Sequence, residues 1–164
     1  MYLSIKDINS YIPKVKGLTV VPFVVNHAFE IESGEFAGIS AARFVGIKQM
    51  LESQARFGFA YTCFMYDEPV ACFGCAPLWQ GVGEMWSIIG KKAKKHPIAL
   101  TKAAIALMDM AEIALDLHRL QITVKTSDKS AVSWAKAIGF ISECTMKQYS
   151  DDKQDYELMA RRIL

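Results

Sequence analysis

The sequence predicts an α/β protein built on a mixed, mostly antiparallel sheet, with a central parallel strand pair and helices on both faces. Between Glu84 and Phe140 the pattern runs strand, loop, helix, strand, helix, and a helical crossover of this length requires that its two strands pair in parallel. Hairpin patterns stand before and after that stretch, at residues 59–75 and 141–163. With 164 residues, 52% hydrophobic and 22% charged, the chain fits one globular domain over residues 1–164.

The first part of the chain has the least regular pattern. Met1–Ile5 fits a short strand, and Lys6–Tyr11 fits a short helix. The apolar run Leu18–Val25 fits a strand or a buried segment. Because Pro22 cannot donate a hydrogen bond to a neighbouring strand, this run is not expected at the centre of a sheet.

A helix is expected from Gly38 to Ala55, with Ser40 as its N-cap, because apolar residues recur there at helical spacing. Just before it, three acidic residues lie close together, namely Glu30, Glu32 and Glu35. They fit either a solvated acidic face or one lip of an acceptor pocket for a basic substrate.

Two β-rich runs predict an antiparallel hairpin. Phe59–Met65 and Pro69–Cys75 flank a turn at residues 66–68, whose acidic residues before a proline suit a tight reversal. The segment Pro77–Gly83 contains two glycines and is expected to be a flexible link into the next strand. A closing hairpin is expected around Ser150–Lys153.

The central stretch has the clearest pattern. Pro97 suits the first position of a helix, Asp128 suits the N-cap of the next one, and Gly139 suits its end. The expected elements are the strand Glu84–Ile89, the loop Gly90–His96, the helix Pro97–Leu117, the strand Arg119–Lys125 and the helix Lys129–Ile138.

Four lysines crowd the loop that leads into the Pro97 helix, namely Lys91, Lys92, Lys94 and Lys95. The free N–H groups and the positive dipole end of a helix N-terminus favour an anion at such a place. The loop therefore predicts a phosphate site, or else a surface segment whose lysines only keep the protein soluble.

This central stretch resembles the GNAT superfamily of acyl-CoA-dependent N-acyltransferases, in which a fourth strand leads to a pyrophosphate loop, a long helix, a fifth strand and a helix ending in Gly-Phe. Within the superfamily the chain looks most like GNAT-like proteins of tailed phages, which are related to an internal virion protein of short-tailed coliphages. The residues that carry the similarity to the helix ending are Asp128, Ala131, Trp134, Lys136, Gly139 and Phe140.

The resemblance implies that acetyl-CoA or another acyl-CoA is the co-substrate and that its acyl group moves to an amine, with the acceptor amine or protein left open. The residues that it places around the cofactor are Ile88, Ile89, Gly90, Lys91, Lys92, Lys94, Lys95, Ile98, Asp128 and Trp134.

The sequence departs from the family pattern in three places, one of which is Asp128, where the family often has an asparagine that contacts the cofactor. Residues 94–97 stand where the family has glycines that let its backbone approach the pyrophosphate. Ala135 stands where the family often has a tyrosine that protonates the departing thiolate, and Tyr149 and Tyr156 on the final hairpin are its candidate substitutes. These departures support an alternative, a catalytically silent GNAT-fold phage protein that is a virion component or binds a host factor.

Glu84 is the candidate general base, because a carboxylate that is partly buried in a cleft can have a raised pKa. The other interpretation is an acid at a strand edge that faces water. The end of the same strand, from Ser87 to Gly90, would supply backbone N–H groups that polarise a thioester carbonyl. Trp86 is expected in the core or in a pocket wall.

The cysteines do not indicate a metal site. Cys72 and Cys75 have the C-x-x-C spacing, but a zinc site needs a second pair of ligands, and these two side chains would face opposite sides of a strand. All four cysteines, including Cys63 and Cys144, are expected to be buried small hydrophobic residues in a reducing compartment.

The location of the protein and its partners are predicted from the net charge and from the lack of a membrane span or a secretory signal in the sequence. No apolar run is long enough to span a bilayer and no secretory signal is visible, so we expect no membrane partner and a cytoplasmic protein of a bacterium or of a phage in its host, with the virion as a further location. The net charge of +2 argues against nucleic acid, and a homodimer is left open.

Overall fold

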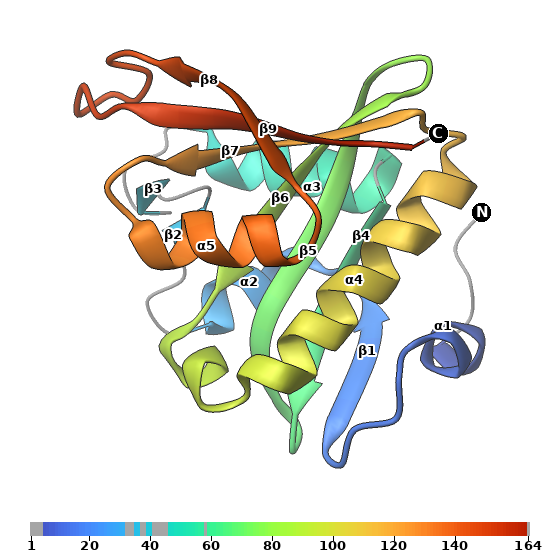
Figure 1. Cartoon of the computed structure of the whole chain (residues 1–164). Helices are drawn as coiled ribbons and strands as arrows, with labels where there is room; N and C mark the ends of the chain where they lie inside the picture. Colours follow the sequence, from blue (N-terminus) through green and yellow to red (C-terminus); the bar gives the residue numbers. More distant parts are fainter. Residues whose placement is uncertain (1–4, 32–34, 37–38, 41–45, 58, 164) are drawn as a thin grey trace.

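The strands form one mixed sheet. A computed structural model describes residues 5–31, 35–36, 39–40, 46–57 and 59–163. Its strands are β1 Leu18–Pro22, β2 Glu35–Phe36, β3 Ile39–Ser40, β4 Phe59–Met65, β5 Glu68–Trp79, β6 Val82–Ile89, β7 Arg119–Lys125, β8 Ile141–Met146 and β9 Tyr156–Arg162. Their order in the sheet is β1-β4-β5-β6-β7-β9-β8, and β2 pairs with both β3 and β6 (Figure 1).

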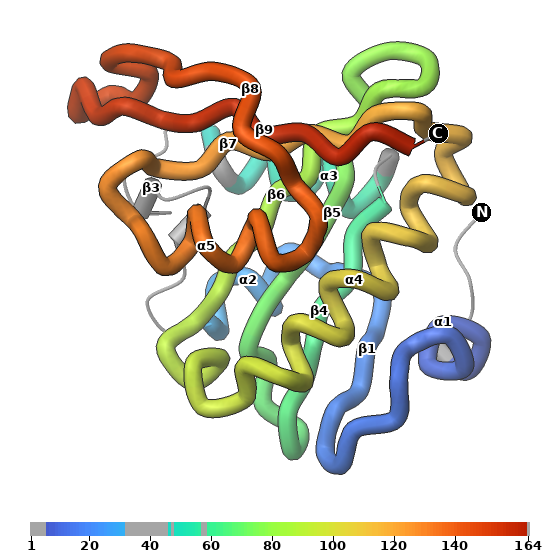
Figure 2. The backbone as a smooth tube through the Cα atoms, in the orientation of Figure 1, coloured from blue at the N-terminus to red at the C-terminus, as the bar shows by residue number. Residues whose placement is uncertain are grey.

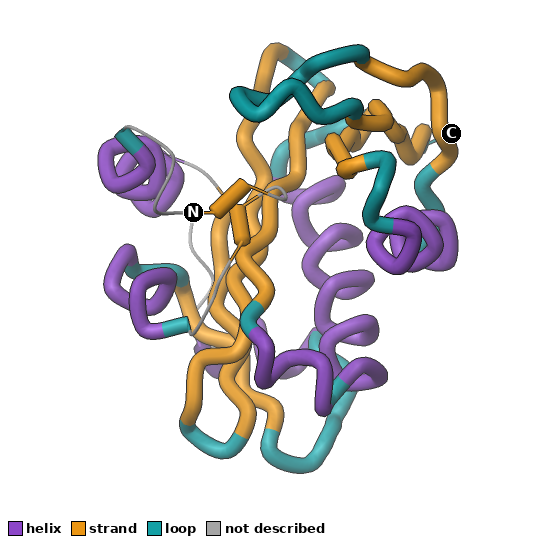
Figure 3. The backbone as a smooth tube through the Cα atoms, turned by 90° about the vertical axis from the view of Figure 1, so that its left-hand side faces the viewer, coloured by secondary structure: helices purple, strands orange, loops and turns teal. Residues whose placement is uncertain are grey.

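Helices cover both faces of this sheet (Figure 3). They are α1 Ile5–Tyr11, α2 Val25–Glu30, α3 Ile47–Phe57, the 3₁₀ helix η2 Lys91–Lys95, α4 Pro97–Ala114 and α5 Lys129–Ala137. One core cluster packs α1, α4 and α5 against the sheet, with Ile8, Leu107 and Ile138 among its members. A second cluster packs α2 and α3 through Ala28 and Leu51. The predicted fold class is confirmed.

The central parallel pair is confirmed as well. β6 and β7 pair in parallel, whereas the other pairings in the sheet of described residues are antiparallel. The crossover between them runs through η2 and α4, whose path is easily followed in Figure 2. Asp128 caps α5 as predicted, because its carboxylate accepts a hydrogen bond from the Ala131 N–H at 2.9 Å.

Both predicted hairpins form. Tyr66 and Asp67 connect β4 to β5 with φ angles of 48° and 68°, as a two-residue type I′ turn requires. β8 and β9 pair as the closing hairpin. The flexible link predicted at Pro77–Gly83 is wrong, because β5 continues to Trp79 and β6 already begins at Val82. Pairing with β6 makes residues 77–79 extended, with a register shift between Pro77 and Trp79, and only residues 80–81 form a turn.

The helix predicted from Gly38 to Ala55 is also wrong at its start. Ser40 belongs to the short strand β3 and is not an N-cap, and α3 begins only at Ile47. Gly46, just before the helix, has a φ of 85°, which a helix cannot continue through. Residues 41–45 of this prediction lie outside the described part of the chain.

The first two elements also differ from the prediction. Ile5 begins helix α1, so it is not the end of a strand, and residues 1–4 lie outside the described part. The apolar run that follows forms β1, an edge strand that ends at Pro22, which agrees with the position expected for proline. None of the helices in the described part of the chain is both long and apolar enough to cross a lipid bilayer.

Gly74 leaves the space on strand β5 that the Trp86 indole fills. A Cβ atom at position 74 would overlap the indole ring, which also contacts Phe23 edge-on at a centroid distance of 5.4 Å and donates to the Gln54 amide oxygen at 3.2 Å. Trp86 is only 7% exposed and belongs to the second core cluster, so of the two predicted positions, core or pocket wall, it takes the core.

Gly74→Ala is expected to lower the free energy of unfolding by about 1–3 kcal/mol, because overpacking forces the indole to move. Urea denaturation measures the effect. In a Trp86→Phe background the smaller ring should make the same substitution less costly. An equal loss in both backgrounds would contradict the contact.

Candidate functional site

The parallel strands β6 and β7 part in the middle of the sheet. Their pairing is confined to Val82–Glu84 of β6 and Arg119–Gln121 of β7. β6 then runs on along β5 to Ile89, while β7 continues along β9. Beyond Glu84 the two strands are not paired with each other, and we call this unpaired gap between them the opening.

Most backbone N–H groups at the end of β6 are directed toward a neighbouring strand and not toward this opening. The Gly90 N–H donates to the Val70 carbonyl at 3.0 Å, so this group, predicted to polarise a thioester, is already used inside the sheet. Because N–H groups alternate along a strand, the N–H of Ile88 also faces β5 and that of Ser87 faces the opening. Ile89 is paired with Glu35 of β2.

Strand β2 therefore covers the far end of the opening. It pairs with β6 at Ile88 and Ile89, directly before the lysine segment. Ser87 lies between this pairing and the last residue paired with β7. The backbone at Ser87 is thus the part of β6 best placed to bind a group that enters between the strands.

Glu84 sits where the two strands part. It is opposite Gln121 on β7 and Ala76 on β5, and its side chain is partly buried. Side-chain alternation places it on the same sheet face as Trp86 and Ile88, the face covered by α2 and α3. Burial raises the pKa of the Glu84 carboxyl above its ordinary value. This is the property expected of a general base in a cleft.

The side chains of the two predicted isoleucine contacts point to opposite faces. Ile88 is buried among Trp86 and the α2–α3 cluster, whereas Ile89 packs against the cluster under α4. Ile88 can therefore reach a ligand in the opening neither through its side chain nor through its N–H group.

The lysine segment forms a 3₁₀ helix anchored by Ala93, which is buried. Lys92 donates to the Glu68 carboxylate at 2.9 Å. Lys91, Lys94 and Lys95 are exposed, and in the described part of the chain none of them lies within ion-pair distance of a carboxylate. Three of the four predicted lysines are therefore available to an anion.

Helix α4 begins next to these lysines without a side-chain cap. Pro97 is its first residue, as predicted, and the His96 side chain makes no capping hydrogen bond. The N–H groups of Ile98 and Ala99 consequently lack the partner that a cap supplies. Ile98 is 70% exposed. The uncapped N–H of Ile98 beside exposed lysines favours an anion at this place, whereas Ala99 is only 4% exposed.

Trp134 links α5 to α4. Its indole N–H donates to the Thr101 hydroxyl at 3.0 Å, and its ring packs against the core cluster under α4. Asp128, at the start of the same helix, is occupied as the N-cap. Both residues predicted to touch the cofactor thus have structural partners within the fold.

The tyrosines proposed as substitute acids lie away from Glu84. Tyr156 is buried and stands opposite Lys125 on β7, four residues from Gln121, which is about 13 Å along the strand. Tyr149 contacts Tyr156 at a ring distance of 5.3 Å. Ala135 is itself buried, so α5 brings no acid to the opening.

The cysteines and His27 form no evident reactive centre. Cys63, Cys72 and Cys75 are buried as predicted, but the prediction is wrong for Cys144, which is exposed because it lies on the edge strand β8. Burial raises the pKa of Cys72 to about 12, so its thiolate is scarce at neutral pH. Among the described residues no cluster of metal-ligating side chains occurs. His27, whose context the sequence did not reveal, makes a 2.9 Å hydrogen bond with the buried Thr62 hydroxyl, and burial lowers its pKa.

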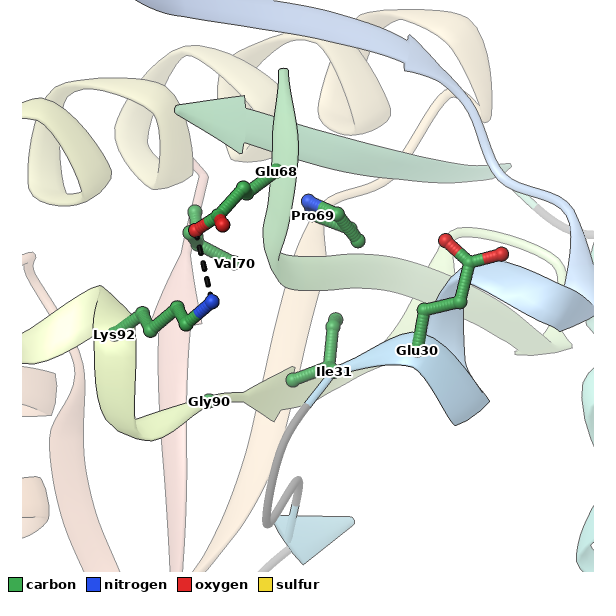
Figure 4. Close-up of a pocket in the computed structure, with 7 residues that line it drawn as sticks. All are labelled: Glu30, Ile31, Glu68, Pro69, Val70, Gly90 and Lys92. Carbon is green, nitrogen blue, oxygen red and sulfur yellow. Dashed lines mark hydrogen bonds and ion pairs between the residues drawn. The ribbon is translucent and has the colours of Figure 1, made fainter. Parts of the chain in front are cut away.

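A cavity of about 200 Å³ lies beside the lysine segment and not between β6 and β7. Figure 4 shows the Lys92–Glu68 pair on one side of it and Glu30 on the other. The residues that line it are Glu30, Ile31, Glu68, Pro69, Val70, Gly90 and Lys92. Of the three acids predicted as a pocket lip, only Glu30 can be placed here, because Glu32 and the Glu35 side chain lie outside the described part.

Comparison with known proteins gives no match by sequence and many by structure. No protein-family model and no curated protein matches the chain. A GNAT-family acetyltransferase from Streptococcus pneumoniae superposes with a TM-score of 0.70 at 17% identity, covering 89% of this chain and 99% of that one. Ard1 from Thermoplasma volcanium superposes with a TM-score of 0.74 at 12% identity, and the match covers 90% of this chain and 99% of Ard1.

A further match is a RimL ribosomal-protein acetyltransferase solved in complex with coenzyme A. It superposes with a TM-score of 0.71 at 15% identity, covering 93% of this chain and 97% of that one. The structural neighbours are thus GNAT acetyltransferases, and the chain has the GNAT fold that its sequence predicted.

The Trp134–Thr101 hydrogen bond should couple α5 to α4. Trp134→Phe and Thr101→Val each remove one partner, and a double-mutant cycle is expected to give a coupling of about 0.5–1.5 kcal/mol. Urea denaturation of the four proteins measures it. Additive effects would show that the two helices are held together without this bond.

Glu84 should make stability depend on pH in a defined direction. Because its pKa is raised in the folded state, its contribution is fully present below the unfolded value of about 4.3 and is lost as the pH rises through the folded value. Relative to wild type, Glu84→Gln should therefore gain stability between pH 4 and pH 8, as measured by urea denaturation. A relative loss over that range would contradict the burial of the carboxyl.

Proposed function

We propose that the protein is a GNAT-fold N-acyltransferase that moves an acyl group, most simply acetyl, from acyl-CoA to an amine. The observation that carries the proposal is the parting of β6 and β7 beside the uncapped, lysine-rich start of α4. The opening between the strands can hold the thioester of acyl-CoA, and the start of α4 can hold the phosphates of the same molecule. The fold shared with acetyltransferases, one of them bound to coenzyme A, supports this combination.

The cofactor would enter with its pyrophosphate on the α4 side. Lys91, Lys94 and Lys95 supply positive charge, and the N–H group of the exposed Ile98 supplies a donor. Side chains at these positions keep the backbone further from the phosphates than glycines would. Binding of the pyrophosphate is therefore mainly electrostatic, and its affinity should fall as the salt concentration rises.

The reaction would take place at the point where the strands part. The Ser87 N–H can stabilise the oxyanion formed when the amine nitrogen attacks the thioester carbon. Glu84 accepts the proton that the amine loses, the carbon–sulfur bond breaks, and the CoA thiolate leaves and takes its proton from water. Because Glu84 faces α2 and α3, the amine would approach from that face, opposite the helix that holds the phosphates.

Lys94→Glu with Lys95→Glu is expected to weaken acetyl-CoA binding at least tenfold, or about 1.4 kcal/mol, in calorimetry on CoA-free protein. Lys136→Glu with Lys153→Glu is the matched control, since it changes the net charge equally on other exposed residues. Equal affinities of the two variants would refute the phosphate site.

Glu84→Gln is expected to bind acetyl-CoA like wild type and to lose about 10²-fold or more in transfer rate to an amine acceptor. Thiol release in an acceptor screen measures the rate. Unchanged turnover would remove Glu84 from the mechanism.

Several observations favour a second candidate, a GNAT-fold protein without catalysis that binds a virion or host partner. β2 occupies part of the β6 edge, and Trp134 is bonded to Thr101 where a cofactor contact was predicted. Trp79, at the β5–β6 turn, is 67% exposed next to the partly exposed Leu78. Absence of acetyl-CoA binding up to about millimolar concentration, together with co-purification of a protein partner that Trp79→Ser releases, would establish this candidate.

A further inference from the structure

Three loops meet at one end of the sheet, the lower end in Figure 2. They are residues 13–17 before β1, the turn at residues 66–68, and residues 91–96 around η2, and together we call them the basic end. Tyr66 joins them. Its N–H donates to the Gly17 carbonyl at 2.9 Å, its ring lies against Gly17, and its ring centroid is 6.2 Å from that of His96.

Positive charge is concentrated at the basic end. It contains six lysines, Lys14, Lys16, Lys91, Lys92, Lys94 and Lys95, against two acids, Asp67 and Glu68. Its net charge is therefore +4, whereas the whole chain carries only +2 and the remainder is negative. Lys14 and Lys16 are exposed and, in the described part of the chain, have no carboxylate within ion-pair distance. The small net charge of the sequence conceals this segregation.

Tyr66 is an unusual residue for its position. Its φ of 48° is one that bulky side chains rarely adopt, and a type I′ turn favours Asn or Gly there. Nevertheless its ring is 60% exposed in the middle of the lysines. A groove of about 530 Å³, lined in part by Lys14, Lys16 and Leu18, opens in the neighbouring loop.

We propose that the basic end binds single-stranded nucleic acid, a role beyond acyl transfer. Lysines act as point charges toward successive phosphates, and an exposed aromatic ring among them provides a platform on which a base can stack. The end contains no arginine, the residue that pairs best with carboxylates, so an acidic peptide fits it less well. Stacking of a base on the Tyr66 ring would explain why a tyrosine occupies a turn position whose backbone conformation is unfavourable for it.

The test is fluorescence anisotropy with a labelled 12-nucleotide oligo(U). Binding should fall with salt with a log–log slope of about −3, as expected when about four phosphates are neutralised on a single strand. Lys14→Glu with Lys16→Glu should weaken binding at least tenfold, whereas the equally charged control Lys136→Glu with Lys153→Glu should change it less than threefold. Equal losses in the two variants would overturn the proposal, because only net charge would then matter.

Tyr66 provides a second, independent test. Tyr66→Asn suits the turn and keeps the fold but removes the ring, so it should weaken oligo(U) binding by about fivefold or more, while Tyr66→Phe keeps the ring and should bind like wild type. If Tyr66→Asn binds like wild type, or if polyglutamate of equal charge displaces oligo(U) as well as unlabelled oligo(U) does, the nucleic-acid assignment is wrong.

Calorimetry with acetyl-CoA on Lys14→Glu with Lys16→Glu separates this inference from the acyltransferase proposal. These two lysines lie outside the proposed cofactor site, so cofactor affinity should stay within twofold of wild type. Loss of oligo(U) binding with intact cofactor binding would support both proposals. Failure of wild type to bind oligo(U) overturns only the inference about nucleic acid.

Discussion

The parting of β6 from β7 after Glu84 is the constraint on which the rest of the structure depends. Parallel strands in one sheet normally satisfy each other's backbone groups along their whole length. Here β6 stays with β5 and β7 stays with β9, so that each strand keeps one partner while the edge between them opens. Backbone groups at this edge must be satisfied by something else.

The chain itself satisfies part of that edge. β2 pairs with Ile88 and Ile89, and α4 and α5 are tied together by Trp134 and Thr101 on the side where η2 leads into α4. Among the described residues, what remains is a short stretch of β6 around Ser87, with Glu84 at one end and the lysines at the other. A ligand that extends along this stretch would need a polar group for the backbone and an anion for the lysines, and acyl-CoA has both.

The sequence predicted the elements whose pattern is local and missed those that depend on distant partners. The crossover through Pro97 and the Asp128 cap follow from spacing and capping within a few residues. By contrast, β5 extends to Trp79 because it pairs with β6 there. Ser40 belongs to a strand because it pairs with Glu35 of β2, and a helical spacing of apolar residues gives no sign of that pairing. Glu84 could be proposed as a base because its place on one strand is a local feature, whereas the surroundings of Trp134 depend on Thr101, 33 residues away.

Hydrogen exchange at the Ser87 amide, with and without saturating acetyl-CoA, tests the central claim most directly. The account predicts that this amide exchanges slowly only when the cofactor is bound, since its N–H faces the opening in the free protein. Amides of the distant strand β8 should not change. If acetyl-CoA binds and exchange at Ser87 stays the same, the opening between β6 and β7 is not the acyl site.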